Sequence, residues 1–155
     1  MKTYEIMSVD LITLYEETNL DLAHTVMKLS RIRHIPVVRG EELVGLITHR
    51  GLYGALVAQV LKSAGSHDQK ALMSVPVSEI MQKNIPTVKP ETDLLETIDL
   101  MLEFKYGCLP VVENGKLVGI VTEADFLKLA KKYLYEQDKG SGKIKDARTD
   151  PTTGS

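Results

Sequence analysis

The fold is decided by the stretch Leu109-Pro110-Val111-Val112-Glu113-Asn114-Gly115-Lys116-Leu117-Val118-Gly119-Ile120-Val121-Thr122. Two runs rich in β-branched residues flank an Asn-Gly pair, which is the strongest short-range signal for a β-hairpin. The same pattern occurs upstream, where Pro36-Val37-Val38 and Leu43-Val44-Gly45 flank Gly40-Glu41-Glu42. We therefore expect two hairpins of the same kind.

These hairpins belong to a longer internal repeat. When the chain is shifted by 74 positions without a gap, positions 3–52 contain 15 identities, where chance gives roughly 3. The identical pairs are Glu5/Glu79, Ile6/Ile80, Met7/Met81, Thr13/Thr87, Glu17/Glu91, Thr18/Thr92, Leu20/Leu94, Met27/Met101, Pro36/Pro110, Val37/Val111, Val38/Val112, Leu43/Leu117, Val44/Val118, Gly45/Gly119 and Thr48/Thr122. A copy of about 50 residues is marginal as an independent domain, so the two copies are expected to pack as one pseudo-twofold pair.

Each copy predicts the order β-α-β-β-α. In the second copy, Val77-Ser78-Glu79-Ile80-Met81 indicates a helical turn and Thr87-Val88 a brief strand. A helix then starts at the cap residue Thr92, and its first-copy counterpart starts at Thr18 with Asp21 three residues later, close to a capping box. Its apolar stripe consists of Leu94, Ile98, Met101 and Leu102.

The closing helix of each copy also carries an apolar stripe. The first copy has Leu52, Leu56 and Val60, and the second has Phe126, Leu129, Ala130, Tyr133 and Leu134. The fold class is therefore mixed α/β (α+β). We expect the first repeat at 1–62, a linker at 63–74, the second repeat at 75–137 and a mobile tail outside the core at 138–155.

Composition limits the classes of function. The chain of 155 residues is 43% hydrophobic and 26% charged, with a formal net charge of −2. It has no basic stripe of the kind that nucleic-acid binding requires, no apolar run long enough to span a bilayer and no secretory signal. A single cysteine, Cys108, fits a reducing compartment, so we expect a soluble cytoplasmic protein with no membrane or nucleic-acid partner.

The start of the second closing helix offers the clearest binding chemistry. Thr122 and Asp125 stand where the strand ends and the helix begins. A carboxylate there can accept hydrogen bonds from both hydroxyls of a ribose, and the free N–H groups of a helix start can hold a sugar or a phosphate. The same two residues also suit a structural role, in which Thr122 caps the helix and Asp125 complements its dipole.

Taken together, these motifs resemble the CBS-domain family, and the duplication resembles a tandem CBS pair, or Bateman module. The resemblance rests on Glu-Ile-Met before a short strand, on Pro-Val-Val and on the closing stretch 117–125, each appearing in order, and it covers residues 3–135. It implies a regulatory module that binds AMP, ADP, ATP or S-adenosylmethionine in clefts between the repeats and requires no cofactor. It also implies a homodimer, with the output passed to a separate downstream protein.

Carried over by position, the resemblance predicts two clefts of unequal strength. The stronger cleft would be formed by Thr122, Asp125, Leu11, Ile12, Ile32, Arg33, His34 and Ile35. There Ile12 and Ile32 would sandwich a base and Arg33, helped by His34 or Arg31, would contact a phosphate, although solvated charges at a helix end explain these cations equally well.

The weaker cleft would be formed by Thr48, Gly51, Ile85, Pro86, Tyr106, Gly107, Cys108 and Leu109. Gly51 stands where the second copy has the acid, and no cation matches Arg33 or His34, although Lys105 lies nearby. The two clefts are therefore expected to differ in affinity or occupancy.

The remaining polar residues predict no catalytic or metal centre. The four histidines (His24, His34, His49 and His67) lack metal-ligand spacing, and Cys108 reads as a small core residue rather than a nucleophile. No nucleophile–base pair can be named, so an enzyme is the least favoured class. The leading hypothesis is a ligand sensor without catalytic activity, and the alternative is a scaffold whose clefts stay empty.

Overall fold

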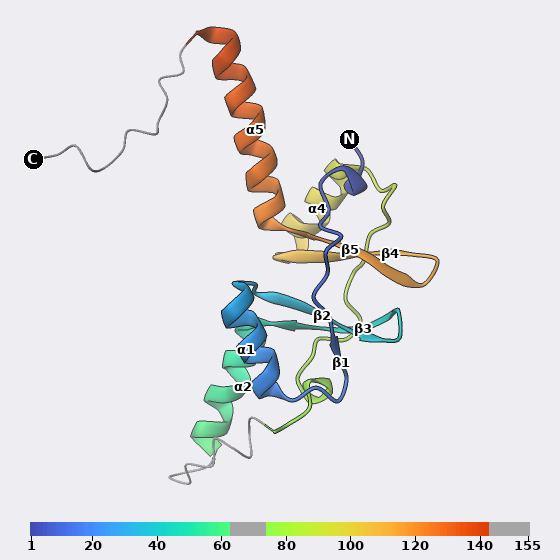
Figure 1. Cartoon of the computed structure of the whole chain (residues 1–155), viewed down its shortest axis with the longest axis vertical. Helices are drawn as coiled ribbons and strands as arrows, with labels where there is room; N and C mark the ends of the chain where they lie inside the picture. The colour runs from blue at the N-terminus through green and yellow to red at the C-terminus, as the bar shows by residue number, and fades with distance from the viewer. Residues whose placement is uncertain (63–73, 143–155) are drawn as a thin grey trace, which may run out of the picture.

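The two copies of the repeat fold in the predicted order, and a computed structural model describes residues 1–62 and 74–142 (Figure 1). The first copy contains η1 (Thr3–Glu5), β1 (Leu14–Tyr15), α1 (Leu20–Ser30), β2 (His34–Arg39), β3 (Glu42–Thr48) and α2 (His49–Lys62). The second contains η2 (Val77–Glu79), α4 (Leu94–Phe104), β4 (Cys108–Glu113), β5 (Lys116–Thr122) and α5 (Glu123–Ser141). A single parallel bridge between Val88 and Val111 takes the place of β1 in the second copy.

The two hairpins share one register. Strand β2 pairs with β1 in parallel and with β3 antiparallel, and β4 pairs antiparallel with β5. The register shifts between Val37 and Val38 and, at the corresponding place, between Val111 and Val112. The two repeats therefore correspond even in the position of an irregularity of the β-bulge type. Figure 1 shows the hairpins stacked across the middle of the molecule, with α1 and α2 on one side and α4 and α5 on the other.

The predicted helix caps at Thr18 and Thr92 are wrong by one residue. Helix α1 is capped by Asn19, whose side chain accepts a hydrogen bond from Leu22 N–H, and α4 starts after Asp93. The two threonines instead accept hydrogen bonds from backbone N–H groups three residues upstream, Tyr15 at 3.2 Å and Lys89 at 3.0 Å. Their role is to close the turn that leads into the helix.

The apolar stripe of α4 also differs from the prediction at one position. Leu94 and Met101 are buried, but Leu102 is 71% exposed. A buried polar residue, Thr97, occupies the inner face instead, and its hydroxyl forms a 2.8 Å hydrogen bond with the hydroxyl of Thr3. The pattern could not reveal this pair because its partners are 94 residues apart.

The first turn of each repeat packs on the other repeat. Thr3 N–H donates to Thr92 C=O, and at the corresponding positions Val77 N–H donates to Thr18 C=O, at 2.9 and 2.7 Å. Ile6 and Met7 join the apolar core of the second repeat, whereas Val77 and Met81 join the core of the first. The repeats are thus interlocked, and the opening turn at 1–8 belongs structurally with the second repeat.

A small third cluster joins the two repeats at the centre of the pair. It consists of Leu46, Cys108 and Ile120, with Leu11 and Ile85 packed against it. Leu46/Ile120 and Leu11/Ile85 are pairs at the repeat distance of 74, so this cluster lies on the pseudo-twofold axis. The repeats thus pack as the predicted pair, with one core in each repeat and this small cluster between them.

The ends of the repeats differ from the predicted boundaries in one respect. Helix α5 continues to Ser141, four residues into the segment assigned to the tail. Leu56 and Phe126 pack on the cores as their stripes predicted, while Tyr133 and Leu134 are exposed. The side chain of Val60, the expected linker at 63–73 and the tail at 143–155 lie outside the described residues. Within residues 1–62 and 74–142, no helix is both long and apolar enough to cross a membrane.

Candidate ligand-binding cleft

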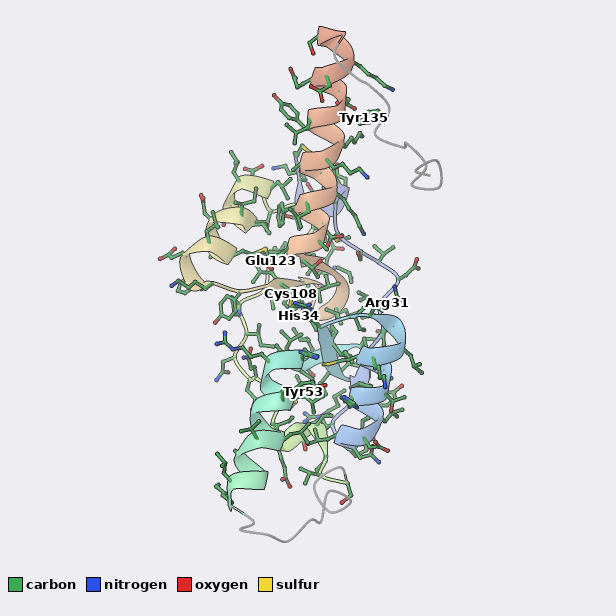
Figure 2. All side chains as sticks on the ribbon, turned by 90° about the vertical axis from the view of Figure 1, so that its left-hand side faces the viewer. Arg31, His34, Tyr53, Cys108, Glu123 and Tyr135 are labelled. Carbon is green, nitrogen blue, oxygen red and sulfur yellow. The ribbon has the colours of Figure 1, made fainter. Side chains whose placement is uncertain are left out.

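A cavity of about 560 Å³ opens where the end of β5 and the start of α5 face the segment before β2. Seven of the eight residues predicted for the stronger cleft line it, namely Leu11, Ile12, Ile32, Arg33, His34, Thr122 and Asp125. Figure 2 shows His34, Cys108 and Glu123 gathered where the two repeats meet, with Arg31 at the edge of the first repeat. The cavity is therefore built from both repeats.

Ile35 does not line this cavity. Its side chain is 0% exposed and belongs to the core of the first repeat. Leu109, its counterpart at the repeat distance, is equally buried in the core of the second repeat. Only the backbone of these two residues could reach a bound molecule.

Asp125 is a buried carboxylate, 7% exposed, at the edge of the cavity. Its Oδ2 accepts hydrogen bonds from the backbone N–H and the hydroxyl of Thr122, at 2.8 and 3.2 Å, and completes a capping box. Its Oδ1 accepts only a long bond of 3.5 Å from the Ser8 hydroxyl. One oxygen therefore stabilises the helix start, and the other retains lone pairs for a ligand hydroxyl.

The walls of the cavity divide into apolar and charged parts. Ile12 and Ile32 offer aliphatic surface, whereas the charged residues are the cations Arg31, Arg33 and Lys128 and the acids Asp10, Glu123 and Asp125. The cations come from the end of α1 and from the second turn of α5. An anionic group can thus meet positive charge from both repeats while a planar group lies against the isoleucines.

His34 joins the two repeats within the cavity. A Cβ placed on Gly107 would lie 3.0 Å from His34 Nε2, so the imidazole rests against the backbone of the second repeat. Burial lowers the pKa of His34, the Arg33 charge lowers it further and the Glu123 charge opposes this shift. His34 is therefore neutral at pH 7 and does not supply the phosphate charge that the sequence assigned to it beside Arg33.

Cys108 occupies the position in β4 that corresponds to His34 in β2. It is buried in the cluster between the repeats, and this burial, with a smaller contribution from Glu123, raises the pKa of its thiol to about 12. The thiol stays protonated at neutral pH. Its chemistry fits the predicted core role and not that of a nucleophile.

The residues predicted for the weaker cleft are less well gathered. Thr48 accepts a 2.9 Å hydrogen bond from Gly51 N–H and so caps α2, but no carboxylate follows it. Gly107 lines the stronger cavity, Ile85 packs in the central cluster and Tyr106 packs on the core of the second repeat. Pro86 is half-buried, and the cavity beside Asp125 includes neither Pro86 nor Thr48 nor Gly51. The second cleft stays a prediction.

The start of α2 instead carries an aromatic cluster. The rings of His49 and Tyr53 lie 4.5 Å apart, and the Tyr53 hydroxyl is 3.3 Å from His24 Nε2. Across the described ranges, no group of three or more His, Cys, Asp or Glu side chains is arranged to hold a metal ion.

Several lining residues were not predicted as site residues, including Ser8, Asp10, Glu123 and Lys128, whereas Arg31 lines the cavity beside Arg33 as the sequence allowed. Ser8 reaches the cavity because its backbone exchanges two hydrogen bonds with Ile120 of β5, at 2.9 and 3.0 Å. That contact follows from the interlocked opening turns. Lys128 could have been predicted from the sequence, because it lies three residues after Asp125 and therefore on the same face of the helix.

The chain belongs to the CBS-domain family, since the model of the CBS domain matches residues 4–58 and 77–132. A CBS domain-containing protein of Dictyostelium discoideum is 33% identical over 132 residues, which cover 84% of this chain and 91% of that protein. The crystal structure of a Vibrio cholerae protein named for acetoin utilization is 30% identical, with a TM-score of 0.76 over 90% of this chain and 96% of that one.

Other relatives place a CBS pair within longer chains or beside a ligand. An inosine-5'-monophosphate dehydrogenase of Korarchaeum cryptofilum is 34% identical, but the match covers only 21% of that enzyme. Two further CBS structures share the fold at TM-scores of 0.72 and 0.71, with 23% and 24% identity. The first is the structure of CBSX2 in complex with AMP. The second is the structure of the CBS pair of MJ0100 with 5'-methylthioadenosine and S-adenosyl-L-methionine. Each match covers 86% of this chain and 98% of the other.

Proposed function

We propose that this chain is a non-catalytic sensor that binds an adenosine-containing ligand, such as AMP, ADP, ATP or S-adenosylmethionine, in the cavity beside Asp125. The observation that carries the proposal is the buried carboxylate of Asp125, one of whose oxygens is not engaged in the capping box. A volume of about 560 Å³ lies within the range of small-molecule sites.

Each part of an adenosine ligand has a matching group. The ribose hydroxyls donate to Asp125 Oδ1, and the base lies between the aliphatic side chains of Ile12 and Ile32. Neutral His34 can accept or donate a hydrogen bond at the edge of the base. The AMP and S-adenosyl-L-methionine complexes of related CBS pairs support this ligand class.

A phosphate would lie toward Arg31, Arg33 and Lys128. The three cations are balanced by Asp10, Glu123 and Asp125, so this cavity is not strongly positive as a whole. This balance supports a ligand with few phosphates over one with many, because each further phosphate adds charge that nothing in the cavity offsets.

Binding in such a cavity can regulate because the ligand contacts both repeats. It stabilises the interlocked pair by RT ln(1 + [L]/Kd), and a ligand that prefers one orientation of the repeats shifts that equilibrium. The signal then passes to a separate downstream protein.

A thermal-shift screen tests the proposal directly. AMP, ADP, ATP and S-adenosylmethionine are added one at a time to the full chain, with GMP and pyrophosphate as controls for the base and the phosphate. A rise in Tm of several degrees with at least one adenosine compound, and none with the controls, is the expected result. No rise with any adenosine compound would favour the alternative, a scaffold with empty clefts.

We also propose that the chain forms a homodimer through its helices. Three leucines of α4 and α5 that do not line the cavity are 62–75% exposed, namely Leu95, Leu102 and Leu134. An apolar surface of this kind is typical of a protein–protein contact. Light scattering at micromolar concentration should give twice the chain mass, and a monomer mass would contradict the proposal.

A further inference from the structure

A second cavity, of about 600 Å³, lies at the hairpin end of the strands, between β3 and the tip of the β4–β5 hairpin. Its apolar surface comes from Val44, Met81, Ile85 and Val112, and its polar surface includes Ser78 and Lys83. It shares no lining residue with the cavity beside Asp125. The two cavities are therefore separate sites.

The second cavity exists because the pseudo-symmetry fails at the hairpin tips. Leu117 N–H donates a 2.9 Å hydrogen bond to Glu41 C=O, and Lys116 forms a 2.9 Å ion pair with the Glu41 carboxylate. The bond related to it by the repeat, from Leu43 N–H to Gly115 C=O, is not formed in the described part of the chain. The tips thus meet on one side of the pair and stay apart on the other.

The counterpart of the Leu117 donor is the N–H of Leu43, a residue that lines the cavity. Leu43 pairs with Val38 in the same register in which Leu117 pairs with Val112. Leu117 uses its N–H outside its own hairpin, so the N–H of Leu43 likewise points away from β2. Leu43 lines the cavity, which places a backbone donor at its wall.

One smaller residue and a cation distinguish this side from its counterpart. Ser78 stands where the first repeat has Tyr4, so no large side chain fills the space. Lys83 stands where the first repeat has Val9. The opening turn of the second repeat therefore contributes both the room and a positive charge.

The charges around this cavity limit what it can hold. Arg39 is engaged by Glu16 through two hydrogen bonds of 2.8 and 3.0 Å. Lys83 takes part in no ion pair among the described residues, and Glu42 adds one acid. The four charged side chains sum to zero, so a single negative charge is accommodated better than a multiply charged group.

We propose that this second cavity binds a small aliphatic carboxylate. The carboxylate accepts hydrogen bonds from Leu43 N–H and from the Lys83 ammonium, and its hydrocarbon part lies against Val44, Met81 and Val112. A phosphate monoester shares the oxyanion chemistry but brings a second negative charge toward Glu16 and Glu42, so it binds more weakly.

The test is a titration of the isotope-labelled full chain with butyrate, followed by amide and methionine-methyl NMR signals. Butyrate should shift the amides of Leu43 and Lys83 and the methyl of Met81. Butyl phosphate should act more weakly, and butylammonium should cause no such shifts. Equal shifts with butylammonium, stronger binding of butyl phosphate or no shift with butyrate would each overturn the proposal.

The repeat supplies matched variants. Ser78→Tyr introduces the residue found at the corresponding position of the first repeat and should abolish the butyrate shifts, whereas Tyr4→Ser should leave them intact. Lys83→Val, on the exposed surface, should weaken butyrate binding by about tenfold or more through loss of a charge-assisted bond. Unchanged butyrate affinity in folded Lys83→Val protein would contradict the assignment even if Ser78→Tyr failed to fold.

Discussion

The closing helices of the two repeats begin alike and diverge three residues later. Thr48 and Thr122 both end a strand and start a helix, but Gly51 follows the first and Asp125 the second. In α5 the carboxylate completes a capping box and borders a cavity, whereas in α2 only the Thr48 hydroxyl caps, through its bond from Gly51 N–H. A single side chain thus gives one copy both a capping box and a buried carboxylate at the edge of a cavity.

The largest stability effects are expected where the opening turns cross between repeats. A Cβ on Gly119 would lie 3.2 Å from Met7 Cγ and 3.2 Å from the Ser8 carbonyl, whereas one on Gly45 would lie 2.7 Å from Met81 Cγ and 3.1 Å from the Gln82 carbonyl. Gly45→Ala and Gly119→Ala should each lower the free energy of unfolding by about 1–3 kcal/mol, with Gly45→Ala the more costly.

Gly54→Ala is the matched control for these variants. A Cβ at Gly54 meets nothing within 4 Å, and the residue lies inside α2, so this change should be neutral or stabilising. Urea denaturation measures all three proteins. Equal stability of Gly45→Ala, Gly119→Ala and wild type would mean that the opening turns pack less tightly than the structure shows.

The second effect concerns Asp125 itself. In the structural role considered from the sequence, Asp125 only complements the helix dipole, which contributes about 0.3–1 kcal/mol. It is in fact buried and accepts two capping hydrogen bonds. Asp125→Ala should therefore lower the free energy of unfolding by about 1–2 kcal/mol. Asp125→Asn keeps an acceptor for Thr122 and should lose less. A loss of stability no larger for Asp125→Ala than for Asp125→Asn would argue against the capping box.

The third effect makes the two helix starts more alike. Gly51→Asp places the acid of α5 at the corresponding position of α2, where a Cβ would lie 3.0 Å from Thr48 Oγ1. The new carboxylate can accept from the Thr48 backbone, and replacing glycine in a helix adds stability, so a gain of about 0.5–1 kcal/mol is expected. A thermal melt that shows a loss instead would mean that the space beside Thr48 cannot take a side chain.

The smallest effect is the dependence of stability on pH that the buried side chain of His34 causes. Because burial lowers the pKa of His34 below its ordinary 6.5, the unfolded chain takes up a proton before the folded chain does. His34 therefore favours folding above pH 6.5, and this contribution is lost as the pH falls through the lowered pKa. Stability measured from pH 7.5 downward should fall less steeply in His34→Gln.

His24→Gln, which removes a histidine from the surface cluster with Tyr53, controls for the histidine content. If His24→Gln flattened the pH dependence and His34→Gln did not, the buried imidazole would not be the group responsible.

Much of the fold could be predicted from the sequence because the repeat is explicit. The gap-free offset of 74 and the Pro-Val-Val and Leu-Val-Gly motifs were enough to place the hairpins, and a family resemblance was enough to bring Thr122 to the same cavity as Arg33. The exchange of opening turns could not be predicted. Local patterns state that a turn forms but not which repeat covers it, and so they miss Ser8 and the burial of Asp125.

The most direct test of the account is calorimetric binding of AMP and ATP to the wild type, Asp125→Asn and Gly51→Asp. If Asp125 holds the ribose, binding by folded Asp125→Asn protein should weaken by roughly thirtyfold or more, since the lost hydrogen bonds to a charged acceptor contribute about 2 kcal/mol or more. Gly51→Asp should keep the wild-type site intact and add affinity at the second cleft. Unchanged AMP and ATP affinity in Asp125→Asn would contradict the account and leave Asp125 as a helix cap alone.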